Sequence, residues 1–183
     1  MFAIGSMLAG FTLQAADEAE PQVPEVRGEK FAGVYRGQVE IWASPTHKQA
    51  AGNFRNGLPD GQWIFWDSGG TKIAEFNYRA GTFSGAVKFY FNTDDGPKWR
   101  GKMKFRGSFL DGEWEGSVMS YYPDGRNRTE RVYRDGVVAD AYAYNVNGKA
   151  FNAADAMKIA LEDEAIDNAY VDALDAYINK WVK

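Results

Sequence analysis

Between residues 33 and 150, hydrophobic and polar positions alternate in short runs that are separated by glycine-containing turns. A period of two is typical of β-strands with one buried face. The side chains expected on that face are Val39, Ile41, Phe54, Trp63, Phe65, Phe76, Tyr78, Val87, Phe89, Met103, Phe105, Trp114, Tyr133, Tyr142 and Tyr144. Dipeptides such as Asn56-Gly57 and Asp135-Gly136 stand between the runs and favour tight hairpin turns. The pattern therefore predicts a mostly β protein built from an antiparallel sheet.

Residues 151–183 follow a helical pattern instead. Hydrophobic residues recur at steps of three and four and are expected to face away from the acidic residues: Met157, Leu161, Ile166, Ala169, Tyr170, Ala173, Leu174, Tyr177, Ile178 and Trp181. Asn152 is expected to cap this helix, and Asp155 suits the dipole of its first turn. A break between Asp163 and Asp167 stays open. We expect the helix to be a lid or terminal cap on the sheet, because its polar face carries acids and not the lysines and arginines of membrane-surface helices.

The β region contains an internal repeat. Residues 37–54 align without gaps on residues 61–78, and seven of the eighteen positions are identical. These are Gly37/Gly61, Gln38/Gln62, Trp42/Trp66, Ser44/Ser68, Lys48/Lys72, Ala50/Ala74 and Asn53/Asn77. A Gly-x-x-x-Gly frame continues from Gly33/Gly37 to Gly57/Gly61 and Gly81/Gly85, and then degenerates to Ser108/Gly112 and Gly136/Asp140. The predicted units are 33–56, 57–80, 81–107, 108–135 and a truncated 136–150.

An aromatic-Arg pair precedes each unit from the second onward: Phe54-Arg55, Tyr78-Arg79, Phe105-Arg106 and Tyr133-Arg134. Together with the two glycines and the aromatic cluster, this pattern resembles MORN repeats, in particular the bacterial variant found in YwqK-type antitoxin-like proteins. The resemblance covers residues 31–150. It implies stacked β-hairpins that form an elongated antiparallel sheet with a binding rather than a catalytic role, and partners that are proteins or anionic lipids. Two functions therefore stay open, a protein-binding scaffold outside the cytoplasm and a cytoplasmic antitoxin-like neutraliser.

The N-terminal region suggests export. Residues 1–16 form an apolar run that is too short to span a bilayer and that ends in small residues, as in a signal peptide, but no basic residue precedes it. Residues 17–32 contain Pro21, Pro24 and Gly28 and are interpreted as a linker. A periplasmic or secreted location follows from this interpretation. The alternative is a buried N-terminal segment in a cytoplasmic protein.

Composition narrows the chemistry. The chain has 183 residues, a length for which a single domain is the default, and no cysteine, which excludes disulfides and thiolate sites. Its net charge of -4 is uneven, since residues 27–150 carry 18 basic and 14 acidic side chains while both ends are acidic. A basic middle region can meet the acidic ends or an anionic partner.

No catalytic constellation is recognisable. His47 is the single histidine and is expected in an exposed turn without a partner that would make it a general base. Most of the other candidate carboxylates precede glycine and are explained by turns. Residues 92–96 only weakly resemble a calcium loop. The sequence predicts a protein that is not an enzyme, with no cofactor, no metal site and no specific nucleic-acid partner.

Two groups of residues are candidates for binding. Trp42, Trp66 and Tyr90 occupy equivalent repeat positions on the side of the strands that faces away from the apolar face, and Arg55 and Arg79 are expected on the same side. The second group alternates with apolar residues in a predicted strand from Lys98 to Arg106 and comprises Lys98, Arg100, Lys102, Lys104 and Arg106. Either group can recognise a protein, and the basic one also suits an anionic lipid or polyanion. The structural alternatives are packing of the aromatic residues beneath the N-terminal segment or the final helix, and simple solvation of the cations.

Overall fold

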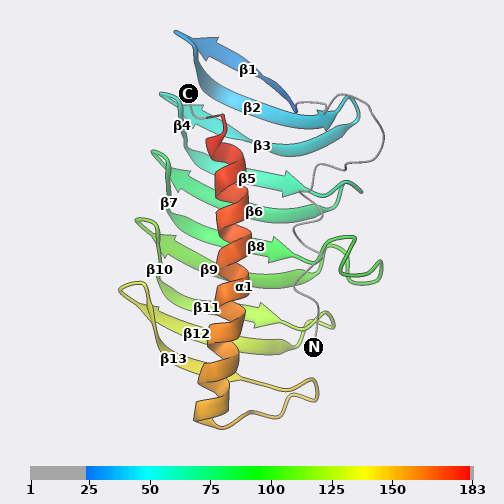
Figure 1. The fold of residues 1–183 in the computed structure, drawn as a ribbon, viewed down its shortest axis with the longest axis vertical. Helices are drawn as coiled ribbons and strands as arrows, with labels where there is room; N and C mark the ends of the chain where they lie inside the picture. The colour runs from blue at the N-terminus through cyan, green and yellow to red at the C-terminus, as the bar shows by residue number, and fades with distance from the viewer. Residues whose placement is uncertain (1–23, 182–183) are drawn as a thin grey trace.

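The computed structural model describes residues 24–181, which form one antiparallel sheet of 13 strands and one helix (Figure 1). This architecture confirms the predicted mostly β fold with a C-terminal helix. The elements are β1 (Glu25–Phe31), β2 (Val34–Ser44), β3 (His47–Arg55), β4 (Leu58–Pro59), β5 (Gly61–Trp66), β6 (Lys72–Arg79), β7 (Thr82–Phe83), β8 (Gly85–Tyr90), β9 (Met103–Leu110), β10 (Glu113–Trp114), β11 (Gly116–Tyr121), β12 (Asn127–Arg134), β13 (Val137–Ala143) and α1 (Ala153–Asn179).

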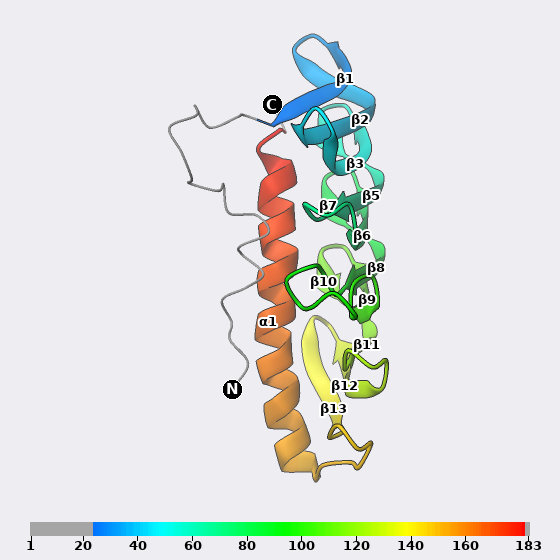
Figure 2. The ribbon, with the colours of Figure 1, turned by 90° about the vertical axis from the view of Figure 1, so that its right-hand side faces the viewer.

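The strands follow one another in chain order across the sheet, from β1 at one end to β13 at the other. Helix α1 crosses them on one face, so that residues 24–181 form two layers and none of these residues forms a helix on the opposite face of the sheet (Figure 2). We call the uncovered side the open face. Residues 25–31 were expected in a linker but form β1, whereas the proposed signal segment lies outside the described residues.

Tight turns stack in a row along one side of the sheet, where the strands end. We call this row of strand ends the turn edge, to distinguish it from the outer strands β1 and β13. Each turn has two residues with positive φ, as a type I′ turn requires: Ala32-Gly33, Asn56-Gly57, Ala80-Gly81, Asp111-Gly112 and Asp135-Gly136. Their spacings are 24, 24, 31 and 24 residues. The predicted boundary at residues 107/108 is therefore wrong, because the frame of the fourth unit is Gly112/Gly116. The third unit is a 24-residue unit with seven extra residues.

The second glycine of each frame sets the register between units. Across Gly85, Tyr78 pairs with Phe83 and Ala74 with Phe89, so the partner strand contains two extra residues. Gly37, Gly61 and Gly116 show the same step and also have positive φ.

Asp140 stands where the last unit would need this glycine, and its φ is not positive. The pairs Tyr133/Val138 and Thr129/Ala143 show a step of only one residue there. A shift by one residue exchanges the two faces of a strand. Ala141 and Ala143 are therefore buried in place of the predicted Tyr142, which is 48% exposed.

The core lies between α1 and the sheet. Most of the side chains predicted for the apolar face are buried there, including Val39, Trp63, Phe89 and Tyr133, and they pack against Val171, Leu174, Tyr177 and Ile178 of the helix. Met103 is an exception. It is paired with Tyr90, and the bulge between this pair and the pair Phe89/Phe105 places Met103 on the open face. Burial of each large side chain contributes about 1.5–3 kcal/mol to stability.

A bulge in every complete hairpin adds one more side chain beneath the helix. The bulged residues are Gln49, Ile73, Lys104 and Arg128, each of which is skipped in the pairing of its strand. Gln49 accepts a hydrogen bond from Tyr177, Lys104 donates to the Tyr170 hydroxyl, and Arg128 donates to Asp163. Ile73 is buried in the core. The bulges therefore give the repeat units a row of side chains that contact the helix. A regular hairpin without a bulge would not have this row.

A second row of polar contacts fixes the other flank of the helix. Tyr78, Trp114 and Tyr133 donate to Asp175, Asn168 and Glu164 over 3.0, 2.7 and 3.0 Å. Asn152 caps the helix as predicted, since its side chain accepts a hydrogen bond from the Asp155 backbone amide. The helix runs without the break that was considered between residues 163 and 167.

The buried side of α1 differs from the prediction. Asp163 and Asp167 are only 5% exposed and face the sheet, while Leu161 and Ile166 are 47% and 38% exposed. Beneath this part of the helix, the sheet presents Arg128, Thr129 and Arg131. The helix therefore turns its acids, and not its largest hydrophobic residues, toward these donors.

Candidate functional site

The open face carries a row of three aromatic side chains, Trp42, Trp66 and Tyr90, which we call the aromatic row. Each lies at or near the end of a strand, and each is half-buried. Because Ile41, Phe65 and Phe89 next to them point into the core, the side chains of the row point away from α1. The structure thus places these three predicted residues together on the face of the sheet opposite α1.

Cations from neighbouring strands lie over these rings. Arg27 is 4.4 Å from the centre of the Trp42 ring, and Lys48 is 5.7 Å from Trp42 and 5.1 Å from Trp66. Lys72 lies 5.1 Å from the centre of Tyr90. At these distances the quadrupole of each ring attracts the cation. The identical pair Lys48/Lys72 in the repeat alignment was the sequence signal for this arrangement.

Two carboxylates hold the rings of the aromatic row and their cations in place through hydrogen bonds and ion pairs. Glu40 accepts hydrogen bonds from Trp42 Nε1 at 3.1 Å and from Lys48 Nζ at 2.8 Å, and its bond with Lys48 lowers its pKa. Glu75 accepts a hydrogen bond from the Tyr90 hydroxyl at 2.8 Å and pairs with Lys72. Burial opposes ionisation of Glu75, but these two partners bring its pKa below the ordinary value.

Arg55 and Arg79 do not join the row. Both lie at the turn edge, at the opposite end of their strands, where Arg55 pairs with Leu58 and Arg79 with Thr82. Arg55 forms an ion pair with Asp60 at 3.0 Å, and its side chain is 72% exposed.

The five cations predicted on one strand face are separated in the structure. Lys98, Arg100 and Lys102 lie in the loop of residues 91–102, which contains the seven extra residues of the third unit. Lys104 is the bulged residue that points toward α1, and it also pairs with Asp95 at 3.1 Å. Of the five, Arg106 alone is exposed on the open face. The prediction failed because the alternation of charges continues through a loop that is not a strand.

The long loop is fastened to its neighbour through Asp67, which is buried. The Asp67 carboxylate accepts hydrogen bonds from the backbone amides of Gly69, Thr71 and Thr93 and from the Thr93 hydroxyl at 2.6 Å. Burial would raise the pKa of Asp67, but these bonds lower it. His47 Nε2 lies 2.7 Å from the Asp67 carbonyl oxygen, so the single histidine contacts the backbone of the turn that contains Asp67.

Among residues 24–181, no group of three His, Asp or Glu side chains is arranged to hold a metal ion. Within the same residues, α1 is not apolar enough to cross a bilayer. The aromatic row, with its stacked cations and hydrogen-bonded carboxylates, is the candidate site in the described part of the chain.

Comparison with known proteins gives no family. Neither a family model nor a curated protein sequence matches the chain. Solved structures with partial similarity include accessory secretory proteins 1, 2 and 3 of Streptococcus pneumoniae, at 12% identity and a TM-score of 0.36 over 60% of this chain and 19% of that one.

Two further structures are the GtfA/B complex bound to UDP and GlcNAc and a variant of S. aureus TarM. They are 13% and 12% identical, with TM-scores of 0.29 and 0.32, over 81% and 79% of this chain and 28% and 24% of theirs. The chain spans less than a third of the length of these proteins. At such TM-scores the similarity contributes nothing to a functional argument.

Proposed function

We propose that the protein is a non-catalytic repeat scaffold that binds a protein partner on its open face, through the aromatic row. The observation that carries this proposal is the position of α1, which covers the apolar face and leaves Trp42, Trp66 and Tyr90 on the other. Binding energy at protein interfaces is concentrated in Trp, Tyr and Arg side chains.

The row is also pre-organised. Its rings are already held by Arg27, Lys48 and Lys72, so less side-chain entropy is lost on binding than for free rotamers. Rings interleaved with cations suit a partner surface with apolar and acidic groups. The cytoplasmic neutraliser considered from the sequence would use the same face.

The test starts with a pull-down from the native host, followed by affinity measurement with the purified partner. The double variant Trp42→Ala with Trp66→Ala should weaken binding by about 30-fold or more, as expected for a loss of about 2 kcal/mol. Trp99→Ala is the matched control, because Trp99 lies in the 91–102 loop and outside the row. Equal binding by the folded double variant and wild type would contradict the proposal.

A vesicle assay separates the lipid alternative. Vesicles of phosphatidylcholine with phosphatidylserine should not retain the protein. Retention that is lost in Lys98→Glu with Lys102→Glu would instead favour anionic lipid as the ligand and count against the protein-binding proposal.

A further inference from the structure

The two terminal strands of the sheet, β1 and β13, differ in the contacts along their outer edges. At the β13 end, the register slips at Asp140, Tyr144 and Ala150 form an isolated bridge, and the Phe151 amide donates to the Ala143 carbonyl before the helix begins. These contacts cover the C-terminal end of the edge of β13. Repeat arrays generally need such atypical terminal elements to end the stack.

Within residues 24–181, the β1 end shows no such features. The pairs Phe31/Val34 and Gly28/Val39 contain the same two-residue step that joins the interior units, so β1 has the register of an interior strand. Among the described residues, no strand pairs with its outer edge. Its backbone amides and carbonyls on that side are therefore available to another strand.

We propose that a second copy of this chain occupies the free edge of β1, through antiparallel pairing of β1 with β1 across a two-fold axis. One open end and one closed end per chain permit a closed dimer. Dimers with two-fold symmetry are the commonest closed assemblies of identical chains.

The charges of β1 select the register of this pairing. In β1, Arg27 and Glu29 point to the open face with Glu25 and Phe31, whereas Gly28 points to the helix side, against Val39. Pairing centred on Gly28 places all seven residues opposite a partner and sets Arg27 of each copy opposite Glu29 of the other. Opposite charges on directly paired residues stabilise antiparallel strands, and like charges destabilise them.

The neighbouring registers are unfavourable. A shift by one residue would place open-face side chains opposite helix-face side chains. A shift by two residues brings either Arg27 opposite Arg27 or Glu29 opposite Glu29, and it shortens the overlap. Only the Gly28-centred register combines full length with opposite charges.

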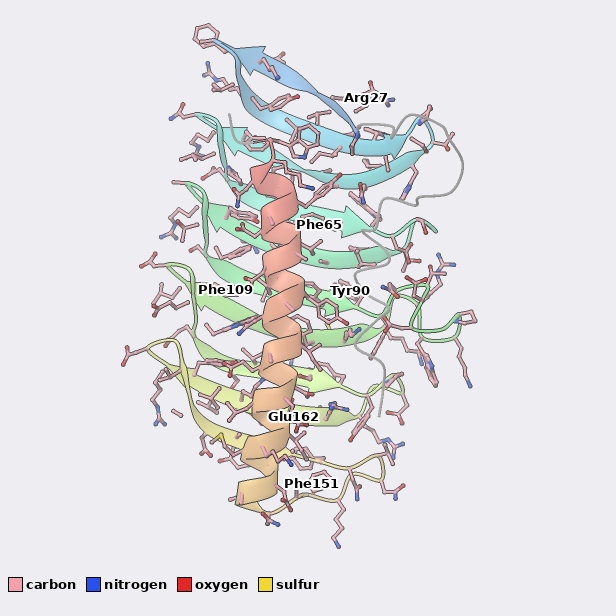
Figure 3. All side chains as sticks on the ribbon, in the orientation of Figure 1. Arg27, Phe65, Tyr90, Phe109, Phe151 and Glu162 are labelled. Carbon is pink, nitrogen blue, oxygen red and sulfur yellow. The ribbon has the colours of Figure 1, made fainter. Side chains whose placement is uncertain are left out.

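This dimer would extend the candidate site. Arg27 lies on the terminal strand, at the end of the sheet opposite Phe151, and it covers the first ring of the aromatic row (Figure 3). The two open faces would continue across the axis, so that the two aromatic rows meet at the paired β1 strands. The dimer does not depend on the identity of any other partner.

Sedimentation velocity of the full chain over a concentration series tests the proposal. Wild type should form a dimer, whereas Arg27→Glu and Glu29→Arg alone should each weaken dimerisation about tenfold or more, because two attractive pairs become repulsive. An equimolar mixture of the two variants should dimerise again, since the glutamate introduced in one chain then meets the arginine introduced in the other. Arg134→Glu, an equal charge change at the other end of the sheet, should dimerise like wild type.

The mixture separates pairing from local damage. Arg27 also bonds Glu25 within its own chain, so a variant with a disordered β1 would not regain dimerisation on mixing. A monomeric wild type overturns the proposal, as does a mixture that stays monomeric. Growth into larger oligomers with concentration would overturn it in favour of β13 pairing, and a dimer that appears only after removal of residues 1–23 would show that the edge is filled within the chain.

Discussion

Asp167 of α1 forms an ion pair with Arg131 of β12 in the interior between helix and sheet, where the two residues are only 5% and 1% exposed. In the repeat, Arg131 occupies the position that Gly52, Phe76 and Gly107 take in the preceding units. A buried cation thus replaces a glycine or an aromatic ring, and the helix supplies its counter-ion.

At a pH at which Asp167 is ionised, we expect Asp167→Ala to lower the free energy of unfolding by about 3–5 kcal/mol, because it leaves a buried guanidinium unpaired. Arg131→Met with Asp167→Leu should recover most of this loss, since Arg131 Nε finds no hydrogen-bond partner among residues 24–181 even in the native pair. Chemical denaturation measures both values. Asp172→Ala, at an exposed helix position, is the control and should stay within about 0.5 kcal/mol of wild type.

The same pair should make stability depend on pH. Burial raises the pKa of Asp167 to about 7, which outweighs the attraction of Arg131. Between about pH 4 and this value the folded protein holds a proton that the unfolded chain has lost, so the contribution of Asp167 to stability decreases as pH rises. Glu40, Glu75 and Asp67 have lowered pKa values, and their opposite effect is confined to more acidic solution.

Asp167→Asn removes the titrating group and keeps an oxygen acceptor for Arg131. The difference in unfolding free energy between this variant and wild type should therefore change across about pH 5–7, with wild type losing stability relative to the variant as pH rises. Parallel curves for the two proteins over this range would show that Asp167 is ionised throughout.

Much of the fold could be predicted from the sequence, because the repeat displays its apolar face and its turns in every copy. Predictions from local sequence patterns failed where a substitution or an insertion at one place changes the register or the path of a whole segment. Asp140 in place of a glycine shifts β13 by one residue, and seven extra residues turn a charged run into a loop. The buried face of α1 was missed because it depends on Arg128 and Arg131, which are distant in sequence.

Only part of the candidate site could be predicted, again because the sequence repeat shows equivalent positions but not the pairing between strands. The equivalence of Trp42 and Trp66 follows from the alignment, but the cations above them come from adjacent strands and their identity depends on pairing register. Arg55 shares the correct face and lies at the wrong end of its strand. A pattern of period two predicts which face of the sheet a side chain occupies. It does not predict which residues of neighbouring strands lie side by side, because that depends on the pairing register.

Gly52 should not tolerate a side chain. A Cβ atom there would lie 2.0 Å from Cδ2 of the Trp63 ring, which is fully buried in the core. We expect Gly52→Ala to cost about 1–3 kcal/mol of unfolding free energy, as overpacked cores do. Asn53→Ala, on the same strand and the open face, should change it by less than about 0.5 kcal/mol.

A second substitution checks the cause. In the Gly52→Ala background, Trp63→Leu should cost less than it does in wild type, because removal of the indole relieves the contact. Additive effects of the two substitutions in thermal or chemical unfolding would mean that the loss at position 52 has another origin.

The 91–102 loop should be replaceable by the loop of the preceding unit. Substitution of these twelve residues by Asp-Ser-Gly-Gly-Thr, the sequence of residues 67–71, restores a 24-residue unit and should leave the circular dichroism spectrum unchanged. The cost should be about 2–4 kcal/mol, because the graft removes buried Phe91 and the bonds of Thr93 to Asp67. A flexible Gly-Ser loop of twelve residues is the control and should be less stable than the graft, since it closes a longer loop without contacts. A graft that loses its cooperative thermal transition while the Gly-Ser variant keeps it would show that the third unit is not a 24-residue unit with an insertion.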